Sequence, residues 1–213
     1  VGGYASVPVL LAAKLRGFPY LIHEQNAWPG LANRLLGRWA ERVCLSFAEA
    51  DCAFHSGRTV LTGNPLRAGM EACPPVPEVE PQLLVFGGSR GARAINLAML
   101  AALPHLEEWR GKLRIVHQTG ADDLERVRNG YCEAGWEAEV VPFIDEMAAA
   151  YAGAHLVLCR AGATTIAELT ACGRPAVLVP YPHAAADHQT ANARALAHRG
   201  AALLLPQAEL APE

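Results

Sequence analysis

No apolar run in the sequence reaches the roughly 18 residues that a membrane-spanning helix needs. The first residues lack the charged start and the cleavage pattern of a signal peptide. The formal net charge is only -3, which makes nucleic acid a poor candidate partner. The six cysteines form no CxxC pair and have no histidine at zinc-finger spacing, so neither a metal site nor a disulfide framework is predicted. These absences indicate a protein that is soluble, or at most peripheral, with reduced cytosolic thiols.

What is present is an ordinary globular composition, with 52% hydrophobic and 18% charged residues in a chain of 213. This length allows one full domain and part of another. Both ends read as cut, because Val1-Gly2-Gly3 is typical of a glycine turn after an absent strand, and the chain stops soon after an apolar strand at 201–205. We therefore expect a fragment.

Apolar strand candidates alternate with helical patterns along nearly the whole chain, which predicts an α/β fold of parallel sheets with crossover helices. Four of the nine residues from 73 to 81 are proline, which neither a helix nor an inner strand tolerates, so this segment is the predicted linker. Residues 1–72 then form one domain and residues 82–213 a second. The strands expected in the second domain are 82–86, 113–117, 139–141, 155–159, 176–179 and 201–205. Such a doubly wound domain binds ligands outside the carboxyl ends of its strands.

The stretch from Arg160 to Glu168 joins an apolar strand to a helix through small residues and then places one carboxylate. Thr164 or Thr165 can cap this helix, and free N–H groups at its start would face an anion. Glu168, about one turn further on, could accept hydrogen bonds from two sugar hydroxyls. The alternative is a capping box in which Glu168 only satisfies backbone donors, and the segment alone favours neither interpretation.

A second glycine-rich segment, Gly87-Gly88-Ser89-Arg90-Gly91-Ala92, follows the first strand of the second domain and leads into a helix. Glycine permits close backbone approach, and the Ser89 hydroxyl with helix N–H groups can hold phosphate oxygens. The segment is neither the dinucleotide GxGxxG nor a Walker A sequence. A tight turn without a ligand is the alternative.

Two polar segments of the first domain are further candidates. Arg67 ends the run Gly63-Asn64-Pro65-Leu66-Arg67, where its guanidinium can pair with a phosphate or simply be exposed between domains. In His23-Glu24-Gln25-Asn26, the first two residues are either an acid–base pair or fasteners of the loop. Asn26 can read an amide or a hydroxyl.

In the second domain, Asp187 and Gln189 offer the donors and acceptors that sugar hydroxyls need, although Asp187 can also cap a helix. Main-chain groups of Ile144 can pair with a flat base edge, and Asp145 after it can cap the next helix. All of these residues follow strands, at the expected ligand edge of the sheet.

Taken together, these motifs closely resemble the MurG family of bacterial glycosyltransferases, in order and across essentially the whole chain. The segments that carry the resemblance are Gly2–Pro8, His23–Asn26, Gly63–Arg67, Gly87–Ala92, Arg160–Glu168 and Asp187–Gln189. The resemblance implies a GT-B architecture of two Rossmann-like domains, the first truncated here. It also implies an inverting transfer of N-acetylglucosamine from UDP-N-acetylglucosamine to the muramyl 4-hydroxyl of lipid I, which gives lipid II for peptidoglycan synthesis, without a cofactor or a metal.

The resemblance implies roles for individual residues. Gly2, Gly3 and Ser6 would belong to a loop of the acceptor-binding domain that helps to hold the acceptor's pyrophosphate. The implied donor-binding residues are Asn26 and Gln189 for the N-acetylglucosamine, Arg67, Ser89, Gly162, Ala163, Thr164 and Thr165 for the diphosphate, Ile144 for the uracil and Glu168 for the ribose. The histidine proposed as the family's general base would precede Val1, and the family's last helices would follow Glu213, so we expect the chain alone to be inactive or nearly so.

The implied partners are UDP-N-acetylglucosamine, lipid I and the anionic membrane surface, with the protein peripheral on the cytoplasmic face of the bacterial inner membrane. Residues 8–15 place Lys14 beside Leu11 and Leu15, and Arg16 follows, which suits an anionic membrane surface or an ordinary surface helix. Two alternatives stay open: a different UDP-sugar transferase of the same fold, and the nucleotide-sugar-binding half of a split transferase that is inactive alone.

Overall fold

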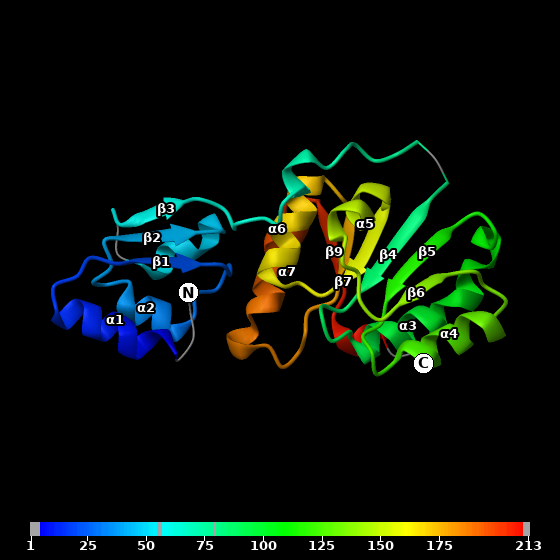
Figure 1. The fold of residues 1–213 in the computed structure, drawn as a ribbon, viewed down its shortest axis with the longest axis horizontal. Helices are drawn as coiled ribbons and strands as arrows, with labels where there is room; N and C mark the ends of the chain where they lie inside the picture. The colour runs from blue at the N-terminus through cyan, green and yellow to red at the C-terminus, as the bar shows by residue number, and fades with distance from the viewer. Residues whose placement is uncertain (1–4, 55–56, 79, 211–213) are drawn as a thin grey trace.

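The computed structural model describes residues 5–54, 57–78 and 80–210, which form two lobes, each around a parallel sheet (Figure 1). The first lobe, here the first domain, has a three-stranded sheet in the order β1-β2-β3. Its elements are α1 (Ser6–Leu15), β1 (Leu21–Glu24), α2 (Leu31–Leu36), β2 (Arg42–Leu45), η1 (Ala48–Ala53) and β3 (Thr59–Leu61). The next element, η2 (Met70–Ala72), packs on the second domain, where Met70 is fully buried. Ile22, Val43 and Leu45 fill the small core beneath α2.

The second domain has a six-stranded parallel sheet in the order β6-β5-β4-β7-β8-β9. Its strands are β4 (Gln82–Phe86), β5 (Arg114–Gln118), β6 (Glu139–Val141), β7 (Leu156–Cys159), β8 (Ala176–Leu178) and β9 (Ala202–Leu204). Its helices are α3 (Arg93–Ala102), η3 (Leu103–Trp109), α4 (Leu124–Glu133), α5 (Met147–Gly153), α6 (Ala163–Cys172), η4 (Ala185–Asp187), α7 (His188–Ala197) and η5 (Gln207–Leu210). This is the doubly wound order, in which the chain starts at a central strand and builds outward in both directions. The expected α/β class is confirmed.

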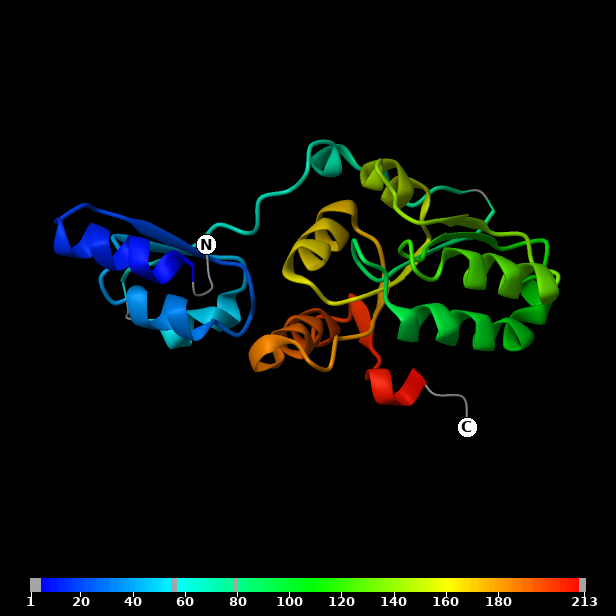
Figure 2. The same ribbon diagram turned by 60° about the horizontal axis from the view of Figure 1, so that its bottom comes forward.

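Helices cover both faces of the second sheet (Figure 2). Every residue of β4 is buried, because the strand is central and alternate side chains enter two different cores. Leu84 and Phe86 pack with α5, α6 and α7, whereas Leu83 and Val85 pack with α3 and α4. Continuous apolar character in such a strand is what two-sided burial requires.

The proline-rich segment is fastened to the second domain. Arg174 is 4% exposed, and its Nη2 donates to the carbonyls of Pro74 (2.7 Å) and Ala152 (3.1 Å), while its Nε donates to Tyr151 O at 2.7 Å. A ring nitrogen of His155 lies 2.9 Å from the Pro77 carbonyl. The predicted linker is therefore hydrogen-bonded to the second domain at Pro74 and Pro77.

The two domains meet where α6 and α7 face the first domain (Figure 1). Arg199 forms an ion pair with Glu49 of η1 at 2.8 Å. Nearby, Asn192 of α7 accepts a hydrogen bond from the Ala27 N–H at 2.8 Å. Polar contacts from opposite ends of the chain therefore connect the domains.

Candidate functional site

The second sheet has one topological switch point, between β4 and β7, from which the chain winds in opposite directions. The loops that follow these two strands are Gly87–Ala92 and Arg160–Gly162, so the two glycine-rich motifs lie side by side at the carboxyl edge. A crevice at this position is the standard ligand site of doubly wound sheets.

The first of these loops is shaped by close contact with the turn after β5. Gly91 has φ 74°, and a Cβ on it would lie 1.8 Å from the carbonyl oxygen of Thr119. Gly88, also with positive φ, leaves Ser89 exposed at the outer side of the loop. Glycine therefore serves close packing of two loops at Gly91, and the predicted phosphate contact Ser89 stays accessible.

The second loop begins α6 without a side-chain cap. Gly162 occupies the N-cap position in an extended conformation, and the helix starts at Ala163. The expectation that Thr164 or Thr165 caps this helix is therefore wrong, because both lie inside its first turn. N–H groups at the start of an α-helix have no intrahelical partner, so this helix start presents donors to an anion.

Glu168 is 2% exposed and lies between two partners. Its Oε2 accepts a hydrogen bond from the Tyr151 hydroxyl at 3.2 Å, and its Oε1 lies 3.1 Å from Nε of Arg67. That ion pair lacks hydrogen-bond geometry, and Oε1 accepts no hydrogen bond from the described residues. Burial raises the pKa of Glu168, while Arg67 and the Tyr151 hydroxyl partly oppose this shift. The capping-box alternative is wrong, because Glu168 points to these partners from the second turn of α6.

Arg67 and Glu168 were expected to contact different parts of one ligand, and the structure brings them together. The Arg67 side chain is 55% exposed and lies against the nearly inaccessible carboxylate. The guanidinium itself stays accessible to solvent and makes no hydrogen bond to the carboxylate. A ligand with two hydroxyls could therefore replace the guanidinium at Glu168 and free it for an anion.

Ile144, expected to meet a base, already has a partner for its N–H. The Gln118 Oε1 accepts this N–H at 2.9 Å. Gln118 ends β5 at the same edge of the sheet and was not among the residues expected at the site. Its position directly after the strand expected at 113–117 was the one feature of the sequence that could have predicted it.

Asn192 is a second site residue that was not expected from the sequence. Its Nδ2 donates to Asn26 Oδ1 (3.1 Å) and to the Ala161 carbonyl (3.2 Å), while its Oδ1 accepts the Ala27 N–H. It therefore ties the loop of Asn26 to the loop that begins α6. Its place one turn after Gln189, on a helix that starts at the ligand edge, was the only hint in the sequence.

The loop with Gln189 is held from two sides. Gln189 Oε1 accepts the Tyr181 N–H at 2.9 Å, and Arg160 donates to the carbonyls of Val179 and Pro180. Asp187 has φ 53° and accepts from the Thr190 hydroxyl without capping the backbone of α7.

In the first domain, Glu24 and His23 fasten loops. The buried Glu24 carboxylate accepts from the N–H groups of Asn26 (3.0 Å) and Gly30 (3.2 Å) and from Asn33 Nδ2 (2.8 Å). His23 Nε2 lies 3.0 Å from the Gly63 carbonyl and 3.2 Å from the Ser46 hydroxyl. These contacts favour the fastening role over an acid–base pair.

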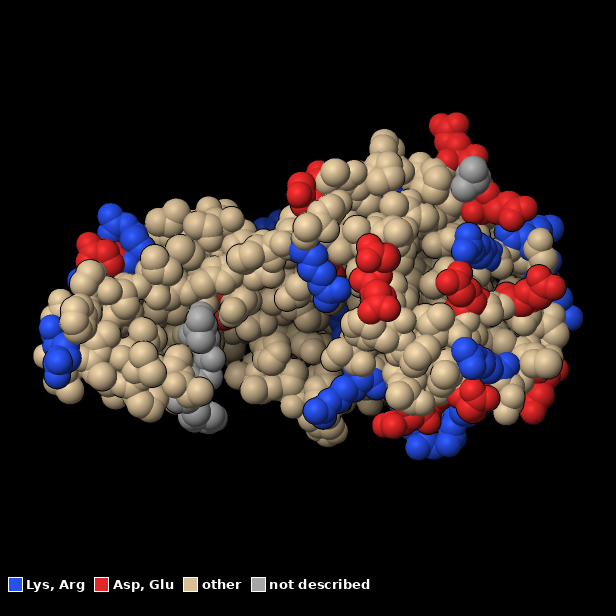
Figure 3. All heavy atoms as spheres, viewed as in Figure 1, with Lys and Arg blue, Asp and Glu red and all other residues tan. Residues whose placement is uncertain are grey.

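Asn26 lies on the wall of a cavity of about 630 Å³ between the domains. Gln25 and Trp28 line it from the first domain, and Ala186 and His188 from the second. The hollow between the lobes is visible in Figure 3. Among the acceptor candidates, Ser6 is buried at the start of α1, whereas Gly2 and Gly3 lie outside the described residues.

The site thus combines an exposed serine in a glycine-rich loop, an uncapped helix start, the buried Glu168 carboxylate beside the half-exposed Arg67 guanidinium, and the main-chain carbonyl of Ile144 for a planar base. In the stretches that the structure describes, no cluster of three or more His, Cys, Asp or Glu could hold a metal ion. This donor set suits a nucleotide with a diphosphate.

Comparison with known proteins agrees with this class of site. Residues 82–213 match the glycosyltransferase family 28 C-terminal domain, and residues 1–45 match the N-terminal domain of the same family. The crystal structure of Acinetobacter baumannii MurG superposes with a TM-score of 0.80 at 43% identity, covering 97% of this chain and 59% of that one. The fold is therefore the expected GT-B architecture of parallel-sheet, Rossmann-like domains. The chain belongs to glycosyltransferase family 28.

Two curated relatives carry the same name, UDP-N-acetylglucosamine--N-acetylmuramyl-(pentapeptide) pyrophosphoryl-undecaprenol N-acetylglucosamine transferase. The relative from Syntrophotalea carbinolica is 71% identical, and the one from Geobacter metallireducens is 54% identical, each over 100% of this chain. The chain spans 60% of the length of either relative. A UDP-N-acetylglucosamine 2-epimerase from Neisseria meningitidis, 16% identical with a TM-score of 0.56, shares the fold.

Proposed function

We propose that this chain is part of an inverting glycosyltransferase that moves N-acetylglucosamine from UDP-N-acetylglucosamine to the muramyl 4-hydroxyl of lipid I. In this reaction the bond between the sugar C1 and the diphosphate breaks, and a new bond forms between C1 and the acceptor oxygen. UDP leaves with the electron pair, and the hydroxyl proton passes to a general base. We do not assign this base to any of residues 5–210. The observation that carries the proposal is the pair of glycine-rich loops at the switch point, in a chain 71% identical to a protein with this name.

The donor would occupy the carboxyl edge of the second sheet. The uncapped N–H groups of Gly162 to Thr165, with Ser89, would hold the diphosphate and stabilise the charge that develops on leaving UDP. Ribose hydroxyls would replace Arg67 at Glu168, and the released guanidinium would reach the phosphates. No metal enters these steps.

The sugar would lie toward the cavity between the domains. Asn26 is on its wall, and Gln189 follows His188, which lines the cavity from the second domain at the start of α7. The acceptor would approach from the first domain, where we place Gly2, Gly3 and Ser6 beside its pyrophosphate. The Asn192 contacts support this arrangement, because they join the loop of Asn26 to the loop proposed for the phosphates.

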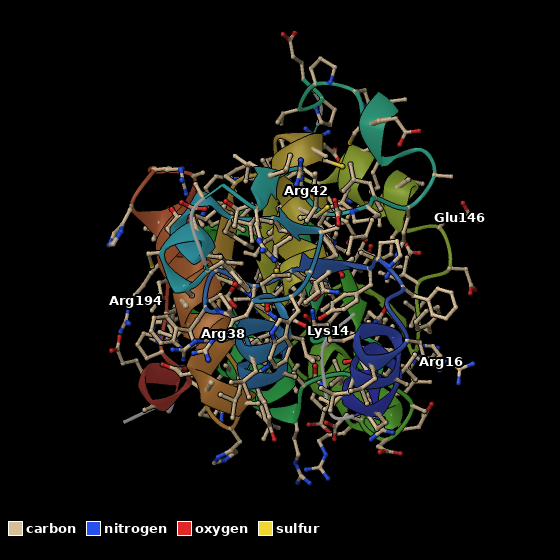
Figure 4. All side chains as sticks on the ribbon, turned by 90° about the vertical axis from the view of Figure 1, so that its left-hand side faces the viewer. Lys14, Arg16, Arg38, Arg42, Glu146 and Arg194 are labelled. Carbon is tan, nitrogen blue, oxygen red and sulfur yellow. The ribbon has the colours of Figure 1, made fainter. Side chains whose placement is uncertain are left out.

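We further propose that the protein works at the cytoplasmic face of the bacterial inner membrane as a peripheral protein. No helix in the described ranges is long and apolar enough to cross a membrane. Leu11 and Leu15 of α1 are exposed beside Lys14, and Arg16 follows. Figure 4 shows these two cations on the first domain, seen from its outer end. Exposed apolar and basic side chains on one helix support contact with anionic lipid.

Calorimetric titration of the 213-residue chain tests the donor assignment. We expect UDP-N-acetylglucosamine to bind more tightly than UDP-glucose or UDP-galactose, and equal affinities would contradict the assignment. Glu168→Gln should reduce the preference for UDP over its 2′-deoxy analogue, because a neutral amide accepts hydroxyl hydrogen bonds more weakly than a carboxylate. The matched control is Glu139→Gln, an exposed carboxylate on the edge strand β6.

The alternative function is a nucleotide-sugar-binding half of a split transferase, inactive alone. It predicts the same donor binding without turnover. Release of UDP by this chain that depends on lipid I would exclude it.

A further inference from the structure

Gln118 connects two loops of the candidate site, although no role has been assigned to it. Its main chain pairs with Phe86 of β4 and with Val141 of β6. It therefore lies between the two strands whose following loops carry Ser89 and Ile144. The residue is 3% exposed, so its polar side chain needs partners within the protein.

Both ends of the Gln118 amide have a main-chain partner. Its Nε2 donates to the Gly88 carbonyl at 2.8 Å, and its Oε1 accepts the Ile144 N–H at 2.9 Å. A flipped amide would place donor against donor and acceptor against acceptor, so these partners determine its orientation. One side chain thus sets the separation of the loop after β4 from the loop after β6.

The residues after Gln118 strengthen this connection. The Thr119 N–H donates to the Val141 carbonyl at 3.0 Å, and the Gly120 N–H donates to the Pro142 carbonyl at 3.1 Å. Gly91 packs directly on the same turn. The side chain of Gln118 therefore acts within a backbone that is already held on both sides.

Because the Ile144 N–H donates to Gln118, a nucleotide base at this loop would face the Ile144 carbonyl instead. Within the part of the chain that the structure describes, no group donates a hydrogen bond to the Ile144 carbonyl. Uracil has an N–H at N3, which can donate to a carbonyl, whereas N3 of cytosine has no hydrogen and is an acceptor. Of the two main-chain groups of Ile144, only the carbonyl is then available to a base, and this favours uracil.

We infer that Gln118 is a positioning and specificity-determining residue of the donor site. It fixes the phosphate loop relative to the base loop through the Gly88 carbonyl, and it leaves the Ile144 carbonyl as the acceptor for N3–H of uracil. The inference rests on the proposed function, and it deepens that function by naming what selects the base.

Titration of the 213-residue chain with UDP and with CDP, followed by calorimetry, tests this role. The unaltered chain should bind UDP more tightly. Gln118→Met removes both hydrogen bonds with little change in volume, so UDP affinity should fall at least about fivefold, and the ratio of the two Kd values should approach one. A general loss of stability would weaken both ligands without changing this ratio.

Gln118→Glu separates the two halves of the connection. The carboxylate still accepts from the Ile144 N–H but opposes the Gly88 carbonyl, so UDP affinity should fall while the base preference stays within about twofold. The matched control is Gln82→Met, the same change at a buried position at the opposite end of the sheet, which should alter neither quantity.

An unchanged preference for UDP in folded Gln118→Met would overturn the inference and leave the proposed function intact. If Gln118→Met does not fold, Gln118→Glu decides, because loss of its base preference would contradict the assigned geometry. If the unaltered chain does not distinguish UDP from CDP, the proposed function and the inference both fail.

Discussion

The buried His117 should make the stability of this chain fall in mild acid. His117 is fully buried in β5, where Nδ1 lies 3.0 Å from the Tyr131 hydroxyl and Nε2 lies 3.1 Å from Asn96 Oδ1. The Asn96 Nδ2 donates to Asp123 and to the Thr119 carbonyl, so its Oδ1 faces the ring and requires an N–H at Nε2. The ring is therefore neutral, with Nδ1 as acceptor for the tyrosine. Burial lowers the pKa of His117 from 6.5 to about 4.

The sign of the effect follows from this depressed pKa. Below a pH of about 6.5 the unfolded chain binds a proton at this histidine that the folded chain does not, so the free energy of unfolding decreases as the pH falls. The loss is absent above that pH and complete below about pH 4, where it reaches about 3 kcal/mol, since each pKa unit corresponds to about 1.4 kcal/mol. Between about pH 7.5 and pH 5 the change is about 2 kcal/mol.

Urea unfolding of the chain and of His117→Gln at these two pH values measures the contribution of His117 to the loss of unfolding free energy. The variant should be less stable than the unaltered chain at the higher pH, by about 1–2 kcal/mol, because the hydrogen-bond network is incomplete. Its loss on acidification should be smaller by about 2 kcal/mol. His198→Gln, at an exposed position, is the control and should keep the full acid dependence. Equal acid losses in the unaltered chain and in His117→Gln would refute the reasoning.

Three further predictions concern the packing of the site loops, the proline-rich segment and the contact between the domains. Gly91→Ala should destabilise the chain by at least about 3 kcal/mol in urea unfolding, because its Cβ would overlap the Thr119 carbonyl. The control Gly88→Ala, at a position with positive φ but open space around it, should cost about 1 kcal/mol. Similar losses in the two variants would contradict the packing argument. Arg174→Met should lower the unfolding free energy by about 3 kcal/mol, because the carbonyls of Pro74, Tyr151 and Ala152 lose their donor. A loss below about 1 kcal/mol would show that these hydrogen bonds do not stabilise the fold. Asn192→Ala should loosen the contact between the domains and increase the radius of gyration in small-angle scattering; an unchanged radius would count against this contact.

Local patterns in the sequence were sufficient for the elements and for their class. A strand was expected at residues 82–86, where Leu83 to Phe86 are apolar, and it is the central strand β4. The strands expected at 82–86 and 139–141 have the same bounds in the structure. Such predictions succeed because hydrophobic periodicity and turn residues act over a few neighbouring positions.

At the start of α6, more than one residue suits the N-cap position. Thr164 and Thr165 are good capping residues, but Gly162 also tolerates the N-cap position, and the helix begins one residue before the first threonine. The result leaves the helix start uncapped, which the site can use.

What the sequence alone determined is the order of strands, helices and glycine-rich loops, and through them the edge of the sheet where a ligand can bind. Tertiary structure decided which polar groups meet there. Gln118 lies 26 residues from Ile144, and Asn192 lies 165 residues from Ala27, so no short-range pattern connects them. Polar side chains find partners wherever the fold brings unsatisfied groups together, and that depends on the strand order rather than on neighbours in the chain.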